Sequence, residues 1–144
     1  MTVLRFIGAI AAVLLSSSVP AQPSEFDGPG YRVLLPHGVT GTTEQRVDFD
    51  ISTFKMADGT VLMSAYAGLH PNFNERGARS ERINGLNGRR LDWTNSEKQK
   101  CAEVLLTIRG SKAITFSVQF WYCLRSDADV LQAEAIIRSI RAEP

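Results

Sequence analysis

Apolar and polar residues alternate over several short stretches of the chain, which is the pattern of strands with one buried face. The first stretch covers residues 30–36 and ends at Pro36-His37-Gly38, a turn signal. The next two, residues 45–56 and 60–69, are separated by Asp58-Gly59, a dipeptide typical of two-residue hairpin turns. We therefore expect a first strand followed by an antiparallel hairpin.

Residues 70–88 show little periodicity and contain several glycine, asparagine and proline turn points. We expect a long irregular segment there, with room for a short helix near residues 75–82. Residues 89–94 then form a predicted strand with Leu91 and Trp93 on one side. Because long loops often carry function, the irregular segment is a candidate working surface.

The clearest strand pattern is a hairpin centred on Lys112. Even-numbered positions on both sides of the turn are apolar, so that face is expected to be core. Cys101 and Cys123 fall on the odd-numbered face, and residues that pair across this turn have numbers of equal parity. The cysteines can therefore pair directly, which sets Arg109 opposite Thr115. In an oxidising compartment this favours a disulfide, worth about 3 kcal/mol in the chain-entropy model, over two free thiols.

The chain ends on a helical pattern, which Ser126 or Asp127 is expected to cap. Its apolar positions, spaced at i, i+3, i+4 and i+7, are Ala133, Ile136, Ile137 and Ile140. This stripe is expected to pack on the even-numbered face of the preceding hairpin. The predicted fold class is α+β: an antiparallel β-sheet of about five to six strands with a C-terminal amphipathic helix packed on one face.

The N-terminal segment has the features of a secretory signal peptide. A basic Arg5 is followed by an apolar run over residues 6–15, too short to cross a bilayer, and by small residues before Ala21. We expect cleavage after Ala21, a flexible leader over residues 22–29 and a single domain over residues 30–144, with no transmembrane segment after cleavage. Because no cysteine follows the apolar run, the lipoprotein route is excluded, and the protein is expected in the periplasm or the extracellular medium.

Composition narrows the class of protein further. The chain has 144 residues, with 16 Lys+Arg against 15 Asp+Glu and a net charge of +1. This balance lacks the basic excess of a dedicated nucleic-acid binder, so no nucleic-acid partner is expected. Hydrophobic and charged fractions of 44% and 22% are typical of a globular domain.

Motifs for catalysis or metal binding do not stand out. The two histidines, His37 and His70, lie in turn contexts far apart, and neither belongs to a metal-binding spacing. A Gly-x-Ser-x-Gly nucleophile elbow does not occur in the sequence. We therefore predict no catalytic residue, no metal and no cofactor, and we do not expect an enzyme, although a triad assembled from distant positions remains an alternative.

One pair of carboxylates has two interpretations. Asp48 and Asp50 stand two apart, so on a strand they share a face and could form an acid/base pair or a cation site. They alternate with apolar residues, namely Val47, Phe49 and Ile51. We favour the simpler interpretation, in which the aspartates form the solvated face and the apolar residues the buried face of the strand.

The segment between Glu75 and Lys100 has seven basic residues against four acidic ones. We favour an ordinary solvated loop, because mixed-sign runs are usually such surfaces, and the alternative is a patch for an acidic partner or an anionic glycan or lipid surface. Trp121 shares the odd-numbered face with the predicted disulfide, where it is either an interface anchor or is covered by another strand or loop. The candidate partner-binding residues are Arg76, Arg79, Arg89, Arg90, Trp93 and Trp121.

The order of these segments suggests a family resemblance. A Gly-Tyr-Arg-Val-Leu-Leu-Pro strand, the Asp58-Gly59 hairpin, the strand over residues 114–124 and the helical stripe over residues 131–140 together resemble the PsbP-like and DcrB-like α/β/α sandwich group. The resemblance implies a non-enzymatic extrinsic subunit, binding module or partner protein, and it carries over no catalytic motif. The chain departs from DcrB-like proteins, which are often lipoproteins, in lacking a lipobox cysteine.

Small size, predicted export, a stapled sheet and an arginine-rich segment favour an exported non-enzymatic protein-interaction module. Another exported protein is the expected partner, and the module is a candidate inhibitor or immunity protein of a periplasmic or secreted enzyme or toxin. The alternative is an envelope-associated accessory domain that holds a small apolar ligand between sheet and helix. An envelope hydrolase is a third possibility.

Overall fold

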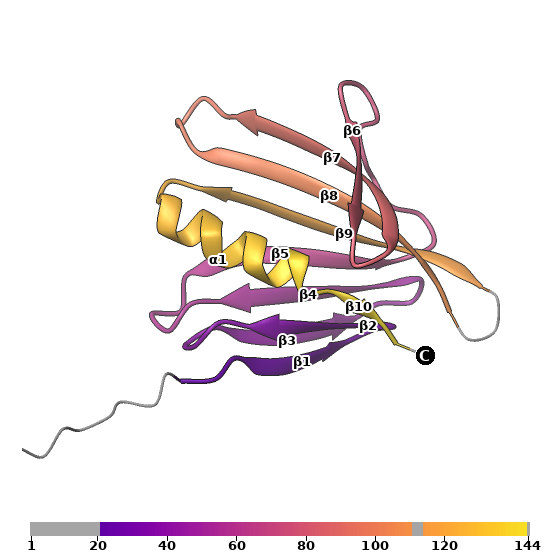
Figure 1. The fold of residues 1–144 in the computed structure, drawn as a ribbon, viewed down its shortest axis with the longest axis horizontal. Coiled ribbons are helices and arrows are strands. Elements are labelled where there is room, and N and C mark those ends of the chain that lie inside the picture. The colour runs from indigo at the N-terminus through magenta and orange to yellow at the C-terminus, as the bar shows by residue number, and fades with distance from the viewer. Residues whose placement is uncertain (1–20, 111–113, 144) are drawn as a thin grey trace, which may run out of the picture.

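Two antiparallel sheets and one helix make up the part of the chain that the computed structural model describes, residues 21–110 and 114–143 (Figure 1). Most of the expected signal peptide, residues 1–20, and the expected turn residues 111–113 lie outside the described residues. The strands are β1 (Ser24–Gly28), β2 (Tyr31–Leu35), β3 (Thr40–Gln45), β4 (Phe49–Lys55), β5 (Val61–Gly68), β6 (Arg79–Ile83), β7 (Leu86–Thr94), β8 (Lys100–Arg109), β9 (Thr115–Leu124) and β10 (Arg141–Ala142), and the helix is α1 (Asp127–Arg138).

The larger sheet has seven strands in the order β3-β4-β5-β9-β8-β7-β6. Its β4–β5 hairpin turns at Asp58-Gly59, as predicted, because Gly59 adopts a φ of +85° and the Asp58 carboxylate accepts a hydrogen bond from the Thr60 backbone at 2.9 Å. The β8–β9 hairpin has the predicted register, with Cys101 opposite Cys123. These two cysteines form a disulfide, which confirms the pairing.

The smaller sheet has three strands in the order β1-β2-β10. Residues 22–29, expected to form a flexible leader, contain β1, which pairs with β2 along its whole length. Aromatic side chains join the two sheets: the ring centroids of Phe26 and Phe54 lie 5.1 Å apart, and those of Tyr31 and Phe120 lie 5.9 Å apart, both edge to face. Burial of these rings fixes the smaller sheet against the larger one.

In Figure 1 the helix lies in front of β5 and β9 of the larger sheet. Ser126 caps its N-terminus by accepting a hydrogen bond from the Asp129 backbone at 3.4 Å. Its buried residues Ala133, Ile136 and Ile137 belong to the common core, and the helix contacts β2 of the smaller sheet as well as β5 and β9 of the larger one. Among the described residues, no helix combines the length and the apolar content that crossing a membrane requires.

The predicted fold class is therefore wrong. The domain is mostly β, with sheets of three and seven strands, and not an α+β fold in which a helix packs on one face of a five- to six-stranded sheet. The prediction missed β3 and β6 because their sequences, TGTTEQ and RSERI, bury almost no side chain. Such strands are held mainly by backbone hydrogen bonds to a neighbour, and these leave no hydrophobic alternation in the sequence.

The expectation for residues 70–88 is wrong in its second half. In place of a short helix near residues 75–82, β6 forms and pairs with β7 through the turn at Asn84-Gly85. Asn84 and Gly85 adopt φ values of 48° and 82°, the left-handed pair that a two-residue hairpin turn requires. An Asn-Gly dipeptide is a strong hairpin signal, so this turn could have been predicted from the sequence.

Candidate binding groove on the open face of the large sheet

The two faces of the seven-stranded sheet have different surroundings. One face packs against α1 and the smaller sheet, and its residues, such as Ala65 of β5 and Phe120 of β9, are fully buried. Residues of the opposite parity point to the other face, which no helix covers within the described part of the chain. We refer to this as the open face.

A groove of about 580 Å³ runs along the open face across β4, β5, β9 and β8. The strand pairings bring its floor together, since Tyr66 of β5 lies between Ile51 of β4 and Gln119 of β9. In the next row, Trp121 of β9 lies opposite Glu103 of β8. Side chains from two hairpins that are far apart in sequence, β4–β5 and β8–β9, therefore form one surface.

Aromatic side chains form one wall of the groove. The Phe49 and Tyr66 rings stack at a tilt, with centroids 5.4 Å apart. Gly68 makes this stacking possible, because a Cβ there would lie 2.4 Å from the Tyr66 hydroxyl and 2.9 Å from the Phe49 Cβ. The Tyr66 hydroxyl in turn accepts a hydrogen bond from the His70 backbone amide at 3.0 Å, so the ring is held at both ends.

The other wall is the connection from β5 to β6, residues 69–78, which crosses the open face. Gln119, only 6% exposed, donates from Nε2 to the Asn72 carbonyl at 3.0 Å. Further along, Arg89 of β7 donates from Nη2 to the Ala78 carbonyl at 2.9 Å. These two bonds fix a segment without regular secondary structure onto the sheet, and they bring His70 and Asn72 to the groove.

The groove is locally acidic. It is lined by the carboxylates of Asp48 and Glu103 and by one imidazole, that of His70. Burial raises the pKa of Glu103 above its ordinary value. In residues 21–110 and 114–143, no cationic side chain lies within 4.0 Å of Glu103, and no cluster of three or more His, Cys, Asp or Glu side chains suits a metal ion.

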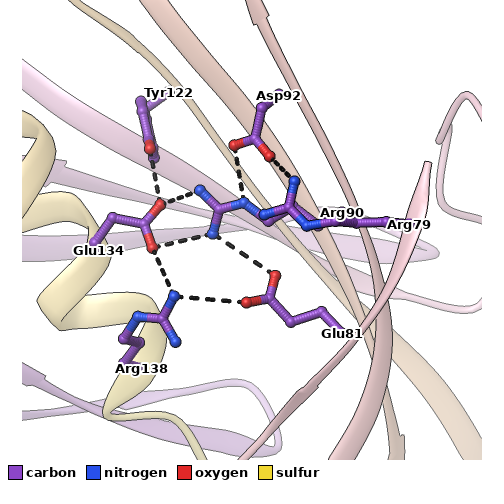
Figure 2. Close-up of polar contacts among 7 residues, drawn as sticks. All are labelled: Arg79, Glu81, Arg90, Asp92, Tyr122, Glu134 and Arg138. Atoms are coloured by element: carbon purple, nitrogen blue, oxygen red, sulfur yellow. Dashed lines mark hydrogen bonds and ion pairs between the residues drawn. The ribbon is translucent and has the colours of Figure 1, made fainter. Parts of the chain in front are cut away.

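The arginines expected to bind a partner do not form one surface. Arg90, 7% exposed, lies on the core side of β7 in an ion-pair network with β6, β9 and α1, which Figure 2 shows. It forms a two-pronged pair with Glu134, 3.0 Å between Nη1 and Oε2, and it also pairs with Asp92 at 2.9 Å. Arg79 pairs with the same Asp92. The six charged residues of the network are three cations and three anions, namely Arg79, Arg90, Arg138, Glu81, Asp92 and Glu134.

The charges of this network are paired with one another and stabilise the fold. Burial lowers the pKa of Arg90, but its hydrogen bonds to Glu134 and Asp92 outweigh burial and raise that pKa overall. Burial raises the pKa of Glu134, but its hydrogen bonds with Arg90 and Tyr122 outweigh burial and lower that pKa overall. Both groups are therefore charged over a wide pH range, and each neutralises the charge of the other. Their charges are not available to attract an acidic partner.

The remaining arginines lie elsewhere. Arg89 is on the open face, where its Nε lies 3.5 Å from Glu75, and Arg76 is exposed in the crossing segment, with its backbone amide bonded to the Asn74 side chain at 3.0 Å. The tryptophans are also separated. Trp121 lines the groove, whereas Trp93 lies opposite Cys101 at another depression of about 740 Å³ that includes Leu131.

The structure also corrects the interpretation of β4. Val47, Phe49 and Ile51 were expected on the buried face, but the buried residues of β4 are Ser52 and Phe54. Val47 is 98% exposed and Phe49 38% exposed. The odd-numbered apolar residues of β4, Phe49 and Ile51, are therefore on the open face, where they line the groove. Asp48 lies just before the strand at the groove, while Asp50 has the parity of the core and pairs with Ala67.

Most residues of the groove were not singled out from the sequence. No sequence motif contains Tyr66, His70, Glu103 or Gln119. Their surroundings depend on the segment over residues 69–78, which crosses the sheet and forms one wall of the groove. Parity alone would have placed Glu103 beside Trp121, because both are odd-numbered residues of the β8–β9 hairpin. That was the available signal.

Comparison with known proteins concerns the fold alone. Neither a family model nor a curated protein sequence matches the chain. A crystal structure of a protein from Bacteroides thetaiotaomicron VPI-5482 is similar in fold, with a TM-score of 0.50 and 13% sequence identity. The similarity covers 86% of this chain and 50% of that protein, so the chain spans about half its length. The resemblance to PsbP-like and DcrB-like proteins stays a prediction.

Proposed function

We propose that the protein is an exported, non-enzymatic interaction module that holds a segment of a partner protein in the groove on its open face. One observation carries the proposal. Apolar and aromatic side chains of β4, β5 and β9 gather on the face of the sheet opposite the core, where within the described chain no helix or second sheet covers them and residues 69–78 form only one wall. Leaving such residues in water is unfavourable, and contiguous exposed apolar surface is typical of interaction sites.

The type of residue supports a protein partner. Tyrosine, tryptophan and phenylalanine are enriched at the centres of protein interfaces, and the groove has one of each. Phe49 is itself 38% exposed, so an aromatic ring at the groove is open to a partner.

A covalent bond joins two of the strands under the groove. Cys101 and Cys123 join β8 and β9 by a disulfide two residues from Glu103 and Trp121. A preorganised surface loses little conformational entropy on binding, which suits an inhibitor or immunity protein that blocks a periplasmic or secreted enzyme or toxin. The disulfide also supports export, since such bonds persist in oxidising compartments. It agrees with the signal peptide predicted over residues 1–21.

A second candidate function rests on the size of the groove. Its volume of about 580 Å³ lies within the range of small-molecule pockets, roughly 300–1,000 Å³. A small apolar ligand would then bind on the open face, and not between sheet and helix as the sequence suggested. Native mass spectrometry of the protein purified from its own cells separates the two functions, because a co-purifying small molecule adds mass to the monomer.

Affinity capture with matched variants tests the first proposal. The oxidised protein is used as bait against envelope and secreted fractions, beside Phe49→Ser in the groove and Leu131→Ser on α1. Leu131 is the control because it is a similarly apolar residue, 70% exposed, outside the groove. We expect one partner near 1:1 stoichiometry to be retained by the wild type and by Leu131→Ser and lost by Phe49→Ser. Equal retention by all three baits, or no partner with any, contradicts the proposal.

A further inference from the structure

We propose that the partner inserts a basic side chain, lysine or arginine, into the groove, where its charge pairs with Glu103 and its stem lies on the Trp121 ring. This inference rests on the proposed function and names the chemistry that the groove selects. It differs from one alternative considered for the arginine-rich segment, which was an acidic partner.

Glu103 differs from the other half-buried glutamates of the structure. Glu81 and Glu134 each lie within 4.0 Å of two arginines, Arg90 and Arg138, and their charges are balanced inside the fold. For Glu103 no such partner exists within the described residues. A carboxylate that loses water without gaining a cation is unfavourable. A cation from outside the chain would remove that penalty.

The residues around Glu103 suit the stem of a long basic side chain. Directly opposite it on the neighbouring strands are Leu91 of β7 and Trp121 of β9, and the same face of β8 carries Leu105 and the Cys101–Cys123 disulfide. All of these surfaces are apolar. Lysine and arginine cover such surfaces with their methylene groups while the charged end reaches a carboxylate, and a cation is attracted to the face of an indole ring.

Charge complementarity points the same way along the groove. The lining contains two carboxylates, Asp48 and Glu103, against one histidine, whereas the whole chain has a net charge of +1. The negative charge is therefore local to the groove. Arg89, on the same face of the sheet, lies 3.5 Å from Glu75 and donates to the Ala78 carbonyl, and it does not line the groove. Complementary charge in a concave site both steers the partner and rejects acidic sequences.

Three short peptides probe this inference: acetyl-Gly-Leu-Lys-Leu-Gly-amide and the same peptide with norleucine or glutamate in the central position. Binding is measured by NMR titration of the oxidised protein, following the Trp121 indole and the amides of β8 and β9. We expect the lysine peptide to bind about tenfold more tightly than the norleucine peptide, with the glutamate peptide weakest. Glu103→Gln should abolish the preference for lysine over norleucine. Glu25→Gln, an exposed acid on β1, should leave it unchanged.

The possible outcomes separate this inference from the proposed function. If lysine and norleucine peptides bind equally and shift groove resonances, the groove binds a protein segment but does not select a cation, and the inference is overturned. A lysine preference that survives Glu103→Gln also overturns it. If none of the peptides shifts groove resonances at millimolar concentration, both the inference and the proposed function fail. Because glutamine has nearly the shape of glutamate, the variant is expected to fold, and its spectrum verifies this before titration.

Discussion

Arg90 of β7 and Glu134 of α1 form a bidentate ion pair, in which Nη1 donates to Oε2 at 3.0 Å and Nη2 donates to Oε1 (Figure 2). Their side chains are 7% and 16% exposed, and the pair joins the large sheet to the helix. Tyr122 donates to the same Glu134 carboxylate at 2.8 Å. This pair belongs to the scaffold, although Arg90 was a candidate for partner binding.

Removing one member of the pair should destabilise the domain strongly. Arg90→Ala leaves Glu134 as a buried charge without its main partner, a change that typically costs about 3–5 kcal/mol. We expect a decrease of this order in the free energy of unfolding, measured by urea denaturation. Arg82→Ala, at an exposed position of β6, should change it by less than about 0.5 kcal/mol. Equal effects of the two substitutions would show that the Arg90 network adds nothing to stability.

The same pair predicts a dependence of stability on pH. The pKa of Glu134 is lowered in the folded state, so its contribution is complete above the unfolded-state pKa of about 4.3 and is lost as the pH falls through the folded-state value. Wild type should therefore be more stable than Glu134→Gln at pH 6 to 7, and this advantage should shrink in acid. Urea denaturation of both proteins from pH 7 to pH 2 measures it. A difference that is constant over this range contradicts the lowered pKa.

The Cys101–Cys123 disulfide closes the β8–β9 hairpin with a sequence separation of 22 residues. In the chain-entropy model a loop of this size contributes about 3 kcal/mol. Replacing both cysteines by alanine should lower the free energy of unfolding by this order, because the unfolded chain gains freedom. Reductant should destabilise the wild type to a similar extent and leave the double variant unchanged. If reductant has no effect on wild-type unfolding, the disulfide does not form in the protein.

Gly68 is predicted to be essential for the shape of the groove. In Gly68→Ala the new methyl group would meet the Tyr66 hydroxyl and the Phe49 Cβ, so the two rings must separate. We expect a loss of about 1–3 kcal/mol of stability, as is typical of overpacking, together with loss of peptide binding in the groove. Gly110→Ala is the control, because its Cβ would have no atom closer than 3.4 Å. A crystal structure of Gly68→Ala with the Phe49–Tyr66 stacking unchanged would refute this role.

The local parts of the fold could be predicted from the sequence. The register of the β8–β9 hairpin, the disulfide and the turn at Asp58-Gly59 follow from parity and turn chemistry over a few neighbouring residues. The helix and its Ser126 cap were predictable for the same reason. Each of these features depends on interactions within one short segment or between two consecutive ones.

The sequence did not predict which side of β4 forms the open face. In β4 the sequence alternates clearly, but alternation does not state which parity meets the core. The choice was made by Phe54, which packs against Phe26 of β1, a strand that the sequence did not reveal. Phe49 and Ile51 were thereby turned to the open face, where they form part of the groove.

By itself, the sequence determined the strands with a buried face, the close hairpins, the paired cysteines and the cap of the helix, because contacts near in the chain control them. Only the tertiary structure decided that β3 and β6 extend the large sheet and that α1 contacts both sheets. It also decided that Arg90 neutralises Glu134 while Glu103 stays without a cation among the described residues. These outcomes depend on backbone pairing and on charges brought together from distant segments, and neither leaves a periodic pattern in the chain.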